Sequence, residues 1–379
     1  MLTLILKVTN ACNMSCQYCS VGDKSDFVIM SEDEMDKAFE WFCNYAKDRR
    51  EKKVSIILHG GEPMLVPAEQ YDRSLRKMLN NYSDIQFTFR IQTNGTILSD
   101  TYLALFQKYA FHVGISLDGL DSVHDRQRRD IFGRGTFDLI FRNIRKLQSD
   151  NLPVSSLMVL TKNSLNADYG YLDYLSEYYI PVKINPLLKI GNALVHEELC
   201  LDEGDYGRYL IDLHKYVLEQ EIGIHISPLA ELQQAIIHEA EPRGCVFHGS
   251  CSNSFICIDQ MGTLYPCGRF ADQHKCILGN IYEGITKEGK RIQENLYARR
   301  SHKLPEKCQS CKYIKLCHAG CSAVTEVGET GQPSVMCKDY CILFDYLYGE
   351  GLRKYKKYLL KKKEQIEKQI LTFRNAYEL

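Results

Sequence analysis

The stretch that decides the fold is residues 3–20, TLILKVTNACNMSCQYCS, in which a short β-rich run leads into three closely spaced cysteines. Residues 3–9 are mainly aliphatic and β-branched, which predicts a buried strand. Cys12, Cys16 and Cys19 follow on what we expect to be a loop. These thiols therefore lie just past the carboxyl end of the first strand, where an α/β barrel places its active site.

Five further β-rich runs alternate with segments of helical periodicity as far as residue 187. In the first of those segments, apolar residues recur at i, i+3, i+4 and i+7, and Ser31 and Glu34 are spaced to form a capping box. Six βα repeats predict a parallel sheet, so we expect the α/β class and a partial (β/α)6 TIM-like barrel. The remaining strands are predicted at residues 54–58, 86–92, 112–117, 154–160 and 182–187.

The pattern changes after the barrel. Two helical stretches, residues 203–221 and 229–239, lead into a region dense in cysteine and glycine. Within that region, residues 255–259 and 263–266 are typical of a β-hairpin. A long helical pattern then runs from residue 340 to residue 379. We expect a barrel at residues 1–190, a helical connection at 191–240, a small cysteine-rich domain at 241–341 and a C-terminal helix at 342–379.

Composition limits the class of protein. The 379 residues include 47 Lys and Arg against 48 Asp and Glu, so no overall basic field favours a nucleic acid as partner. No run of about 18 apolar residues exists and the N-terminus lacks the pattern of a signal peptide, so we expect a cytoplasmic protein with no membrane partner. The chain has 16 cysteines. In a reducing compartment that number predicts metal or cluster ligation rather than disulfides.

The first cysteine loop fits an iron–sulfur cluster with one open position. Three thiolates on a short loop can bind three irons of a cubic [4Fe–4S] cluster and leave the fourth iron without a protein ligand. That open iron suits a small chelating ligand. The competing interpretation is a zinc loop, but a closed structural zinc site needs a fourth Cys or His. No Cys or His at short spacing completes the set formed by Cys12, Cys16 and Cys19.

The spacing Cys12-x3-Cys16-x2-Cys19, with Tyr18 just before the third cysteine, resembles the cysteine loop of the radical S-adenosylmethionine (SAM) enzymes. The resemblance extends along the barrel, because three further matching stretches lie at the carboxyl ends of predicted strands. They are His59-Gly60-Gly61-Glu62-Pro63, Thr93-Asn94-Gly95 and Gly114-Ile115-Ser116-Leu117-Asp118-Gly119.

The resemblance implies that SAM chelates the open iron and that seven residues bind it. The glycine-rich turn exposes backbone groups, one acidic residue helps to hold the ammonium group, and the others contact the adenine, the ribose and the carboxylate. Gly60 and Gly61 form the turn, Glu62 is the acidic residue, Tyr18 and Leu187 contact adenine, and Ser116 and Arg128 bind the ribose and carboxylate region.

A second set of cysteines has the spacing Cys308-x2-Cys311-x5-Cys317-x3-Cys321 and is followed by Cys337. Pairs of the form Cys-x2-Cys are common in zinc ribbons, so a zinc site is the competing interpretation. Together with an upstream Cys-x5-Cys and a Gly-x4-Cys, the set resembles the SPASM extension of radical SAM enzymes that modify peptides. That resemblance implies two auxiliary [4Fe–4S] clusters, the first held by Cys245, Cys251, Cys267 and Cys321, the second by Cys308, Cys311, Cys317 and Cys337.

Two of these ligand assignments have alternatives. Cys257 lies five residues beyond Cys251, at the spacing that separates Cys245 from Cys251. Cys341 lies four residues after Cys337 and can exchange with it. The other cysteines, Cys43, Cys200 and Cys276, are expected to be structural.

The resemblance implies three [4Fe–4S] clusters and SAM as cofactors, with reductive cleavage of SAM to a 5′-deoxyadenosyl radical that abstracts a hydrogen atom. Two auxiliary clusters offer a path for an electron, so we expect net oxidation of a peptide or protein side chain. The implied partners are that substrate and a reductant such as flavodoxin or ferredoxin. Because the first strand starts at Thr3, we expect either a separate leader-peptide-binding protein or substrate binding by the barrel and the C-terminal helix.

The chain differs from one well-known branch of this family. Anaerobic sulfatase-maturing enzymes, which oxidise Cys or Ser to formylglycine, carry an aspartate base directly after the cysteine that matches Cys267. Gly268 occupies that position here, so the catalytic residue is unassigned. We therefore expect a ribosomal peptide maturase that forms a thioether or another crosslink. The alternatives are a sulfatase-maturing enzyme, a radical SAM enzyme acting on a small molecule or cofactor precursor, and a non-radical iron–sulfur electron carrier.

Overall fold

The first predicted strand becomes β1 (Leu2–Lys7) in the computed structural model, which describes residues 1–22, 27–324 and 332–377. Across that part of the chain, one sheet runs in the order β11-β10-β9-β8-β1-β2-β3-β4-β5-β6-β7. The strands from β1 to β7 are all parallel, which confirms the α/β class. The other parallel strands are β2 (Lys53–His59), β3 (Gln86–Thr93), β4 (His112–Ser116), β5 (Val154–Leu160), β6 (Val182–Pro186) and β7 (Ile226–Ser227).

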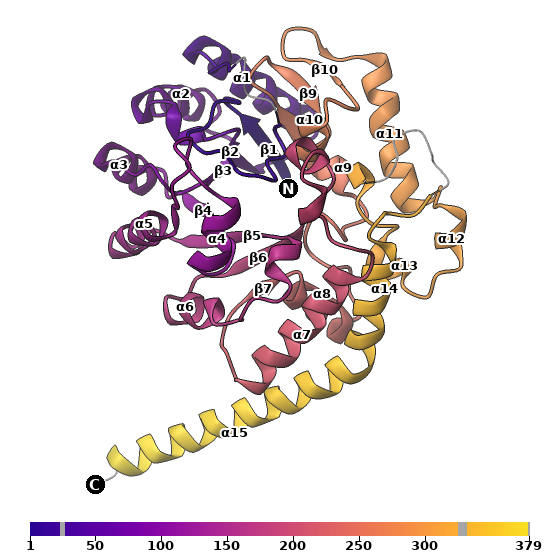
Figure 1. The fold of residues 1–379 in the computed structure, drawn as a ribbon. Coiled ribbons are helices and arrows are strands. Elements are labelled where there is room, and N and C mark those ends of the chain that lie inside the picture. The colour runs from indigo at the N-terminus through magenta and orange to yellow at the C-terminus, as the bar shows by residue number, and fades with distance from the viewer. Residues whose placement is uncertain (23–26, 325–331, 378–379) are drawn as a thin grey trace.

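Helices cover the outer face of this curved sheet in an arc (Figure 1). The first of them, α1 (Glu32–Asp48), begins at the predicted capping box, in which Ser31 and Glu34 satisfy each other's backbone N–H groups. Its apolar stripe, which includes Phe39 and Phe42, is fully buried against the strands. The arc continues with α2 (Ala68–Asn81), α3 (Asp100–Lys108), α5 (Phe137–Ser149) and α6 (Tyr171–Glu177), whereas α4 (Asp121–Gln127) lies inside the arc in this view.

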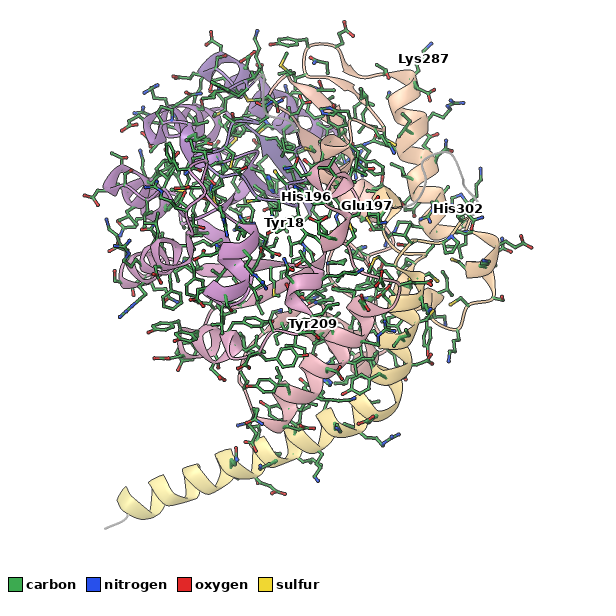
Figure 2. The ribbon with its side chains drawn as sticks, viewed as in Figure 1. Tyr18, His196, Glu197, Tyr209, Lys287 and His302 are labelled. Atoms are coloured by element: carbon green, nitrogen blue, oxygen red, sulfur yellow. The ribbon has the colours of Figure 1, made fainter. Side chains whose placement is uncertain are left out.

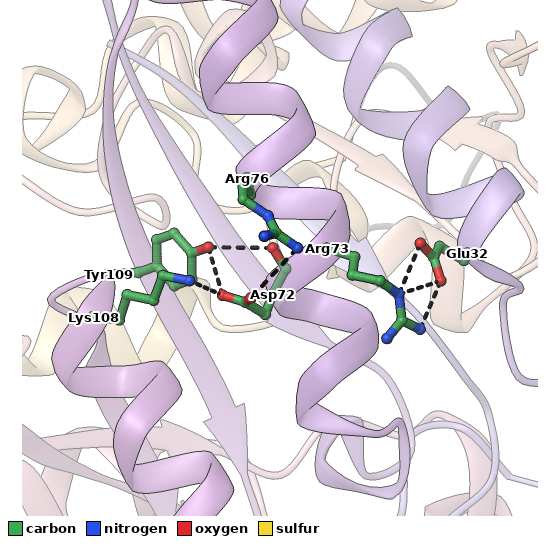
Figure 3. A network of polar contacts seen from close by, with 6 residues as sticks. All are labelled: Glu32, Asp72, Arg73, Arg76, Lys108 and Tyr109. Atoms are coloured by element: carbon green, nitrogen blue, oxygen red, sulfur yellow. Dashed lines mark hydrogen bonds and ion pairs between the residues drawn. The ribbon is translucent and has the colours of Figure 1, made fainter.

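Surface ion pairs connect the first three helices of the arc (Figure 3). Arg73 of α2 pairs with Glu32 at the start of α1, with an N–O distance of 2.8 Å. On the same helix, Asp72 accepts hydrogen bonds from Lys108, the last residue of α3, and from Tyr109, the residue after it. Exposed pairs of this kind contribute little to stability, because water and salt screen them. The buried stripes therefore hold the arc together, and the ion pairs add a small amount.

The cysteine-rich region extends the same sheet. Its hairpin strand β8 (Phe255–Ile258) lies parallel to β1, with Cys257 opposite Ile5, and β9 (Thr263–Tyr265) returns antiparallel. The sequence pattern predicted the hairpin but not its partner, because the free edge of β1 becomes apparent only when the strands are assembled. The region also contains β10 (Gly279–Asn280), β11 (Gly284–Ile285), α9 (Cys251–Ser254), α10 (Gly268–Asp272), α11 (Lys287–Ser301), α12 (Glu306–Gln309) and α13 (Ile314–Cys317).

Helices lie between and after these two regions. The predicted connection contains α7 (Asp205–Glu219) and α8 (Leu229–His238), with the short strand β7 between them, which the sequence pattern did not predict. The predicted C-terminal helix is divided into α14 (Cys337–Tyr346), a π-helical turn (Leu347–Gly351) and α15 (Leu352–Tyr377), which extends away from the body (Figure 1). Short 3-10 turns lie at Pro63–Leu65, Lys162–Ser164, Gly191–Leu194, Glu197–Leu199 and Ser322–Val324. None of the helices described is long and apolar enough to cross a membrane.

We expect truncation of a buried β1 side chain to cost far more stability than truncation on α15. Leu6 is fully buried in β1, whereas Leu360 of α15 is 63% exposed. Leu6→Ala should lower the free energy of unfolding of the apoprotein by roughly 2–5 kcal/mol, because it leaves a cavity in the core. Leu360→Ala should change it by at most about 0.5 kcal/mol. Urea denaturation followed by circular dichroism measures both, and equal midpoints would contradict the placement of β1.

Candidate functional site

A cavity of about 270 Å³ lies at the carboxyl ends of the parallel strands, and we call it the barrel cavity. The thiols of Cys12, Cys16 and Cys19 line it together. Figure 2 places Tyr18 near the middle of the molecule in this view. Six of the seven residues predicted to bind SAM are also in this wall, namely Tyr18, Gly60, Gly61, Ser116, Arg128 and Leu187.

Glu62, the seventh predicted residue, is fully buried and does not belong to that wall among the described residues. Its carboxylate accepts hydrogen bonds from the Thr93 hydroxyl and the Asn94 backbone N–H, both at 2.7 Å. It also accepts the Met64 backbone N–H at 2.9 Å. Burial raises the pKa of Glu62, and these hydrogen bonds oppose the rise. In this structure Glu62 therefore joins the loop after β2 to the end of β3.

A buried polar network supports the wall beside the cysteines. The Tyr18 hydroxyl donates to the Asp118 carboxylate and accepts a hydrogen bond from Arg128 Nη1 at 2.7 Å. Asp118 also accepts the Val159 backbone N–H at 2.9 Å, which connects the network to β5. Within the described part of the chain, the buried Nε of Arg128 has no hydrogen-bond partner. Such an atom fits a site that completes its hydrogen bonds with a bound polar group.

The glycine turn after β2 is required by the close approach of the cysteine loop. The Gly61 N–H donates to the Thr9 carbonyl at 2.7 Å. A Cβ at Gly61 would lie 2.1 Å from the Ala11 carbonyl oxygen, and one at Gly60 would lie 2.2 Å from the Thr9 carbonyl oxygen. The resemblance assigns these glycines to the ligand, and the structure shows that they also let the two loops pack together. Asn94 completes the contact, because its side-chain amide lies 3.8 Å from the Cys12 sulfur.

A second cavity, of about 240 Å³, lies beside β1 and β8, and we call it the four-cysteine cavity. Cys245, Cys251, Cys267 and Cys321 line it together, which is the set expected for the first auxiliary cluster. Arg269 Nη1 donates to the Cys321 sulfur at 3.3 Å. The competing Cys257 is fully buried in β8, where it pairs with Ile5 of β1 and Tyr265 of β9.

The two cavities have four wall residues in common, His59, Asn185, Arg269 and Asp272, which we call the shared wall. Asp272 forms an ion pair with Lys7, whose side chain is 8% exposed. His59 Nδ1 accepts the Gly60 backbone N–H at 2.7 Å. Burial, reinforced by the nearby Lys7 charge, lowers the pKa of His59 to about 4, so the imidazole is neutral at pH 7.

The sequence pattern assigns no role to these shared-wall residues or to Lys7. One signal was available, because Lys7 is the single charged residue within the apolar run of residues 3–8. A second signal is that Asp272 lies four residues after Gly268, one helical turn from the position where a carboxylate was missing.

The remaining predicted ligands form a third group. Burial raises the pKa of Cys317 to about 12, with further contributions from Cys337, Cys308 and Cys311, so these four thiols lie close together. Cys341 lies beside Cys337 on the same face of α14 and contacts it. The alternative that exchanges Cys341 for Cys337 therefore stays open. Cys43 is fully buried in the core and Cys200 is buried next to Tyr18 and Leu187, as expected of structural residues.

These thiols suit clusters rather than a single ion. Within residues 1–22, 27–324 and 332–377, no group of three or more His, Cys, Asp or Glu side chains is arranged to hold one metal ion. A cubic cluster binds each thiolate through a different iron, so its ligands surround a larger volume than the ligands of one ion. One cavity lined by three thiols and another lined by four thus match an open and a closed [4Fe–4S] site.

Comparison with known proteins gives consistent similarities. The model of the radical SAM superfamily matches residues 6–169. The cysteine-type anaerobic sulfatase-maturating enzyme of Clostridium perfringens strain 13 is 26% identical over 92% of this chain and 96% of its own length. The serine-type enzyme of Bacteroides thetaiotaomicron is 23% identical over 91% and 88%.

Solved structures are similar to this fold. Native anSMEcpe with bound AdoMet and Kp18Cys peptide superposes with a TM-score of 0.79 over 93% of this chain and 98% of its own, at 23% identity. Streptococcus suis SuiB bound to S-adenosylmethionine has a TM-score of 0.62 over 89% of this chain and 77% of its own, at 17% identity. At these identities the likeness concerns the fold.

We expect Gly61→Ala to disrupt the barrel cavity, because the new Cβ would collide with the backbone of the cysteine loop. Binding of SAM to anaerobically reconstituted protein, measured by equilibrium dialysis, should fall at least tenfold. Gly223→Ala is the matched control, since an added Cβ there meets no atom within 4 Å. Equal SAM binding by the two variants would contradict the packing described for the glycine turn.

Proposed function

This chain is an enzyme of the radical SAM superfamily, as its cysteine spacing predicted, and from that premise we propose that it oxidises a cysteine or serine side chain of a peptide or protein by two electrons. The observation that carries this proposal is the shared wall of the two cavities. A substrate side chain held there contacts both the site of hydrogen abstraction and the site that takes up an electron.

The relatives support side-chain oxidation over crosslinking. The enzymes that match more than nine tenths of this chain are named cysteine-type and serine-type sulfatase-maturating enzymes. The crosslinking interpretation, which the glycine at residue 268 favoured, has less support. The structure of SuiB bound to its precursor peptide SuiA is similar to this chain in fold alone, at 19% identity.

SAM and [4Fe–4S] clusters are the cofactors, and we propose which residues hold them. Cys12, Cys16 and Cys19 hold the cluster in the barrel cavity. Cys245, Cys251, Cys267 and Cys321 hold the first auxiliary cluster, and Cys308, Cys311, Cys317 and Cys337 hold the second. When bound, the first cluster and SAM together supply a 5′-deoxyadenosyl radical that can abstract an unactivated hydrogen atom.

The chain's own residues bind and orient the cosubstrate. Arg128 is held by Tyr18, so its unpartnered Nε is available to a carboxylate or ribose oxygen. Ser116 accepts a hydrogen bond from Gln92 at 3.2 Å, and both residues line the same cavity. Leu187 and Tyr18 form one apolar cluster with Ala193 and Leu199, a surface that suits a purine ring.

We also propose the domain organisation of the chain. Residues 1–190 form the SAM-binding barrel, 191–240 the helical connection, 241–341 the SPASM domain and 342–379 the C-terminal helix. A reductant such as flavodoxin or ferredoxin supplies the electron for SAM cleavage. The substrate reaches the shared wall either through a separate leader-peptide-binding protein or by binding to the barrel directly.

The assignment of three clusters is tested by counting iron. Anaerobically reconstituted protein should bind about twelve irons and form 5′-deoxyadenosine from SAM when reduced. Replacing Cys12, Cys16 and Cys19 by Ala should leave about eight irons and abolish 5′-deoxyadenosine. Cys276→Ser is the control and should retain both. Zinc in place of iron, or undiminished 5′-deoxyadenosine in the triple variant, would refute the proposal.

Activity is tested with two synthetic peptides that differ only in carrying one Cys or one Ser. Mass spectrometry should detect an aldehyde on at least one of them after incubation with reduced enzyme and SAM. Neither peptide yielding an aldehyde would contradict side-chain oxidation and favour a small-molecule substrate.

Arg269 should raise the reduction potential of the first auxiliary cluster. Its guanidinium donates to the Cys321 sulfur, and a cationic donor stabilises the reduced, more negative form of a cluster. Arg269→Gln should therefore lower the midpoint potential, measured by spectroscopic redox titration in the protein that lacks the three barrel cysteines. Arg291→Gln is the control, because Arg291 is 70% exposed and pairs with Glu288. An unchanged potential for Arg269→Gln would count against this role.

A further inference from the structure

Asp272 lies in the wall of both cavities. In the walls of the barrel cavity and the four-cysteine cavity, it is the only Asp or Glu among the described residues. It is the last residue of α10, which begins directly after the cluster ligand Cys267. A carboxylate at the junction of the two cavities lies where the substrate of the proposed function must lie.

Lys7 positions this carboxylate. The two side chains form an ion pair in which both are nearly buried, 8% exposed for Lys7 and 13% for Asp272. Burial by itself would lower the pKa of Lys7, but the charge and hydrogen bond of Asp272, together with the nearby Cys257 and Asp259, outweigh burial, so the pKa of Lys7 is raised. Lys7 therefore stays protonated and donates to Asp272 Oδ1, and the carboxylate keeps a second acceptor oxygen.

The other residues of the shared wall cannot take a proton from a substrate. Arg269 carries only donors, and the amide of Asn185 is not a base. His59 is neutral, but its Nδ1 already accepts the Gly60 N–H, so the ring proton is on Nε2, which acts as a donor. Asp272 is thus the proton acceptor of this wall.

The geometry of α10 places Asp272 close to Gly268, the position where the sequence lacks a carboxylate. Residues 268 and 272 are four apart, so they lie on the same side of the helix, one turn from each other. An added Cβ at Gly268 would meet only the Ile5 side chain, at an ordinary 3.7 Å. A Cβ at residue 268 therefore fits against Ile5 without displacing it, and residue 268 belongs to the wall of the four-cysteine cavity.

From these observations we propose that Asp272 is the catalytic base that accepts the proton lost by the substrate thiol or hydroxyl, an assignment that rests on the proposed side-chain oxidation. Oxidation of –CH2–XH to –CH=X, where X is sulfur or oxygen, removes two hydrogens. One leaves the carbon as a hydrogen atom, taken by the radical derived from SAM. As the C=X bond forms, the X–H bond breaks, its proton passes to Asp272 and the remaining electron passes to an oxidised iron–sulfur cluster. With X as oxygen the product is the aldehyde; with X as sulfur it is a thioaldehyde, which water converts to the aldehyde with release of hydrogen sulfide.

The test uses Asp272→Asn, which keeps the shape of the side chain and an oxygen for Lys7. The probe is the synthetic Cys peptide, or its Ser counterpart, deuterated at the β carbon. We expect roughly 100-fold less aldehyde, the usual contribution of a general base, with deuterium still transferred into 5′-deoxyadenosine. Unchanged aldehyde formation would overturn the proposal. No aldehyde from wild-type protein on either peptide would instead refute the proposed function.

A relocated carboxylate provides the positive control. Gly268→Asp in the Asp272→Asn background should restore aldehyde formation, because residue 268 lines the four-cysteine cavity one helical turn from residue 272. Failure of this rescue, with iron content and 5′-deoxyadenosine formation intact, would contradict the proposal.

A folding defect is separated from a catalytic one by a second variant. Lys7→Met with Asp272→Leu replaces the buried ion pair by apolar side chains of similar size, a change that often preserves stability. After anaerobic reconstitution, this double variant should unfold at the urea midpoint of the reconstituted wild-type protein and still lack aldehyde formation. Aldehyde formation at the wild-type level in the double variant would overturn the role of Asp272.

Discussion

The structure depends on the hydrogen bonding of β1 along both of its edges. Residues 2–7 pair in parallel with β2, and residues 3–6 pair in parallel with β8. The loop after β1 carries the three barrel cysteines, and the segments that flank β8 carry Cys251 and Cys267. One central strand therefore fixes the distance between the two cavities, and parallel pairing directs the ends of both strands toward the same region. The shared wall is the consequence.

Buried charge is concentrated where the cavities meet. Lys7 and Asp272 neutralise each other, Arg269 contacts a thiol, and Arg128 is held by Tyr18 beside Asp118. An unpaired charge at this depth would cost several kcal/mol, so each group needs its partner. In low dielectric, the same pairs give fixed dipoles and a fixed proton acceptor, which a solvated site could not provide.

Local regularities of the sequence predicted most of the fold. The six barrel strands, the capping box at Ser31, the hairpin and the helices of the connection appear within a few residues of their expected bounds. These features arise from spacing between near neighbours, which the sequence displays directly. The pairing of β8 with β1, the short strand β7 and the π-helical turn at Leu347–Gly351 were not predicted, because each depends on contacts with distant segments.

The sequence by itself predicted the chemistry of the site, because the three thiols on one loop and the glycine turn resemble the segments by which radical SAM enzymes bind a cluster and SAM. Only the tertiary structure decided how those parts meet. It brought Lys7 to Asp272 across 265 residues, placed Cys251 rather than Cys257 in the cavity wall, and turned Glu62 toward Thr93 and Asn94. The reason is physical: ligand spacing is a property of a short segment, whereas a buried ion pair or a shared wall exists only when separate segments exclude water together.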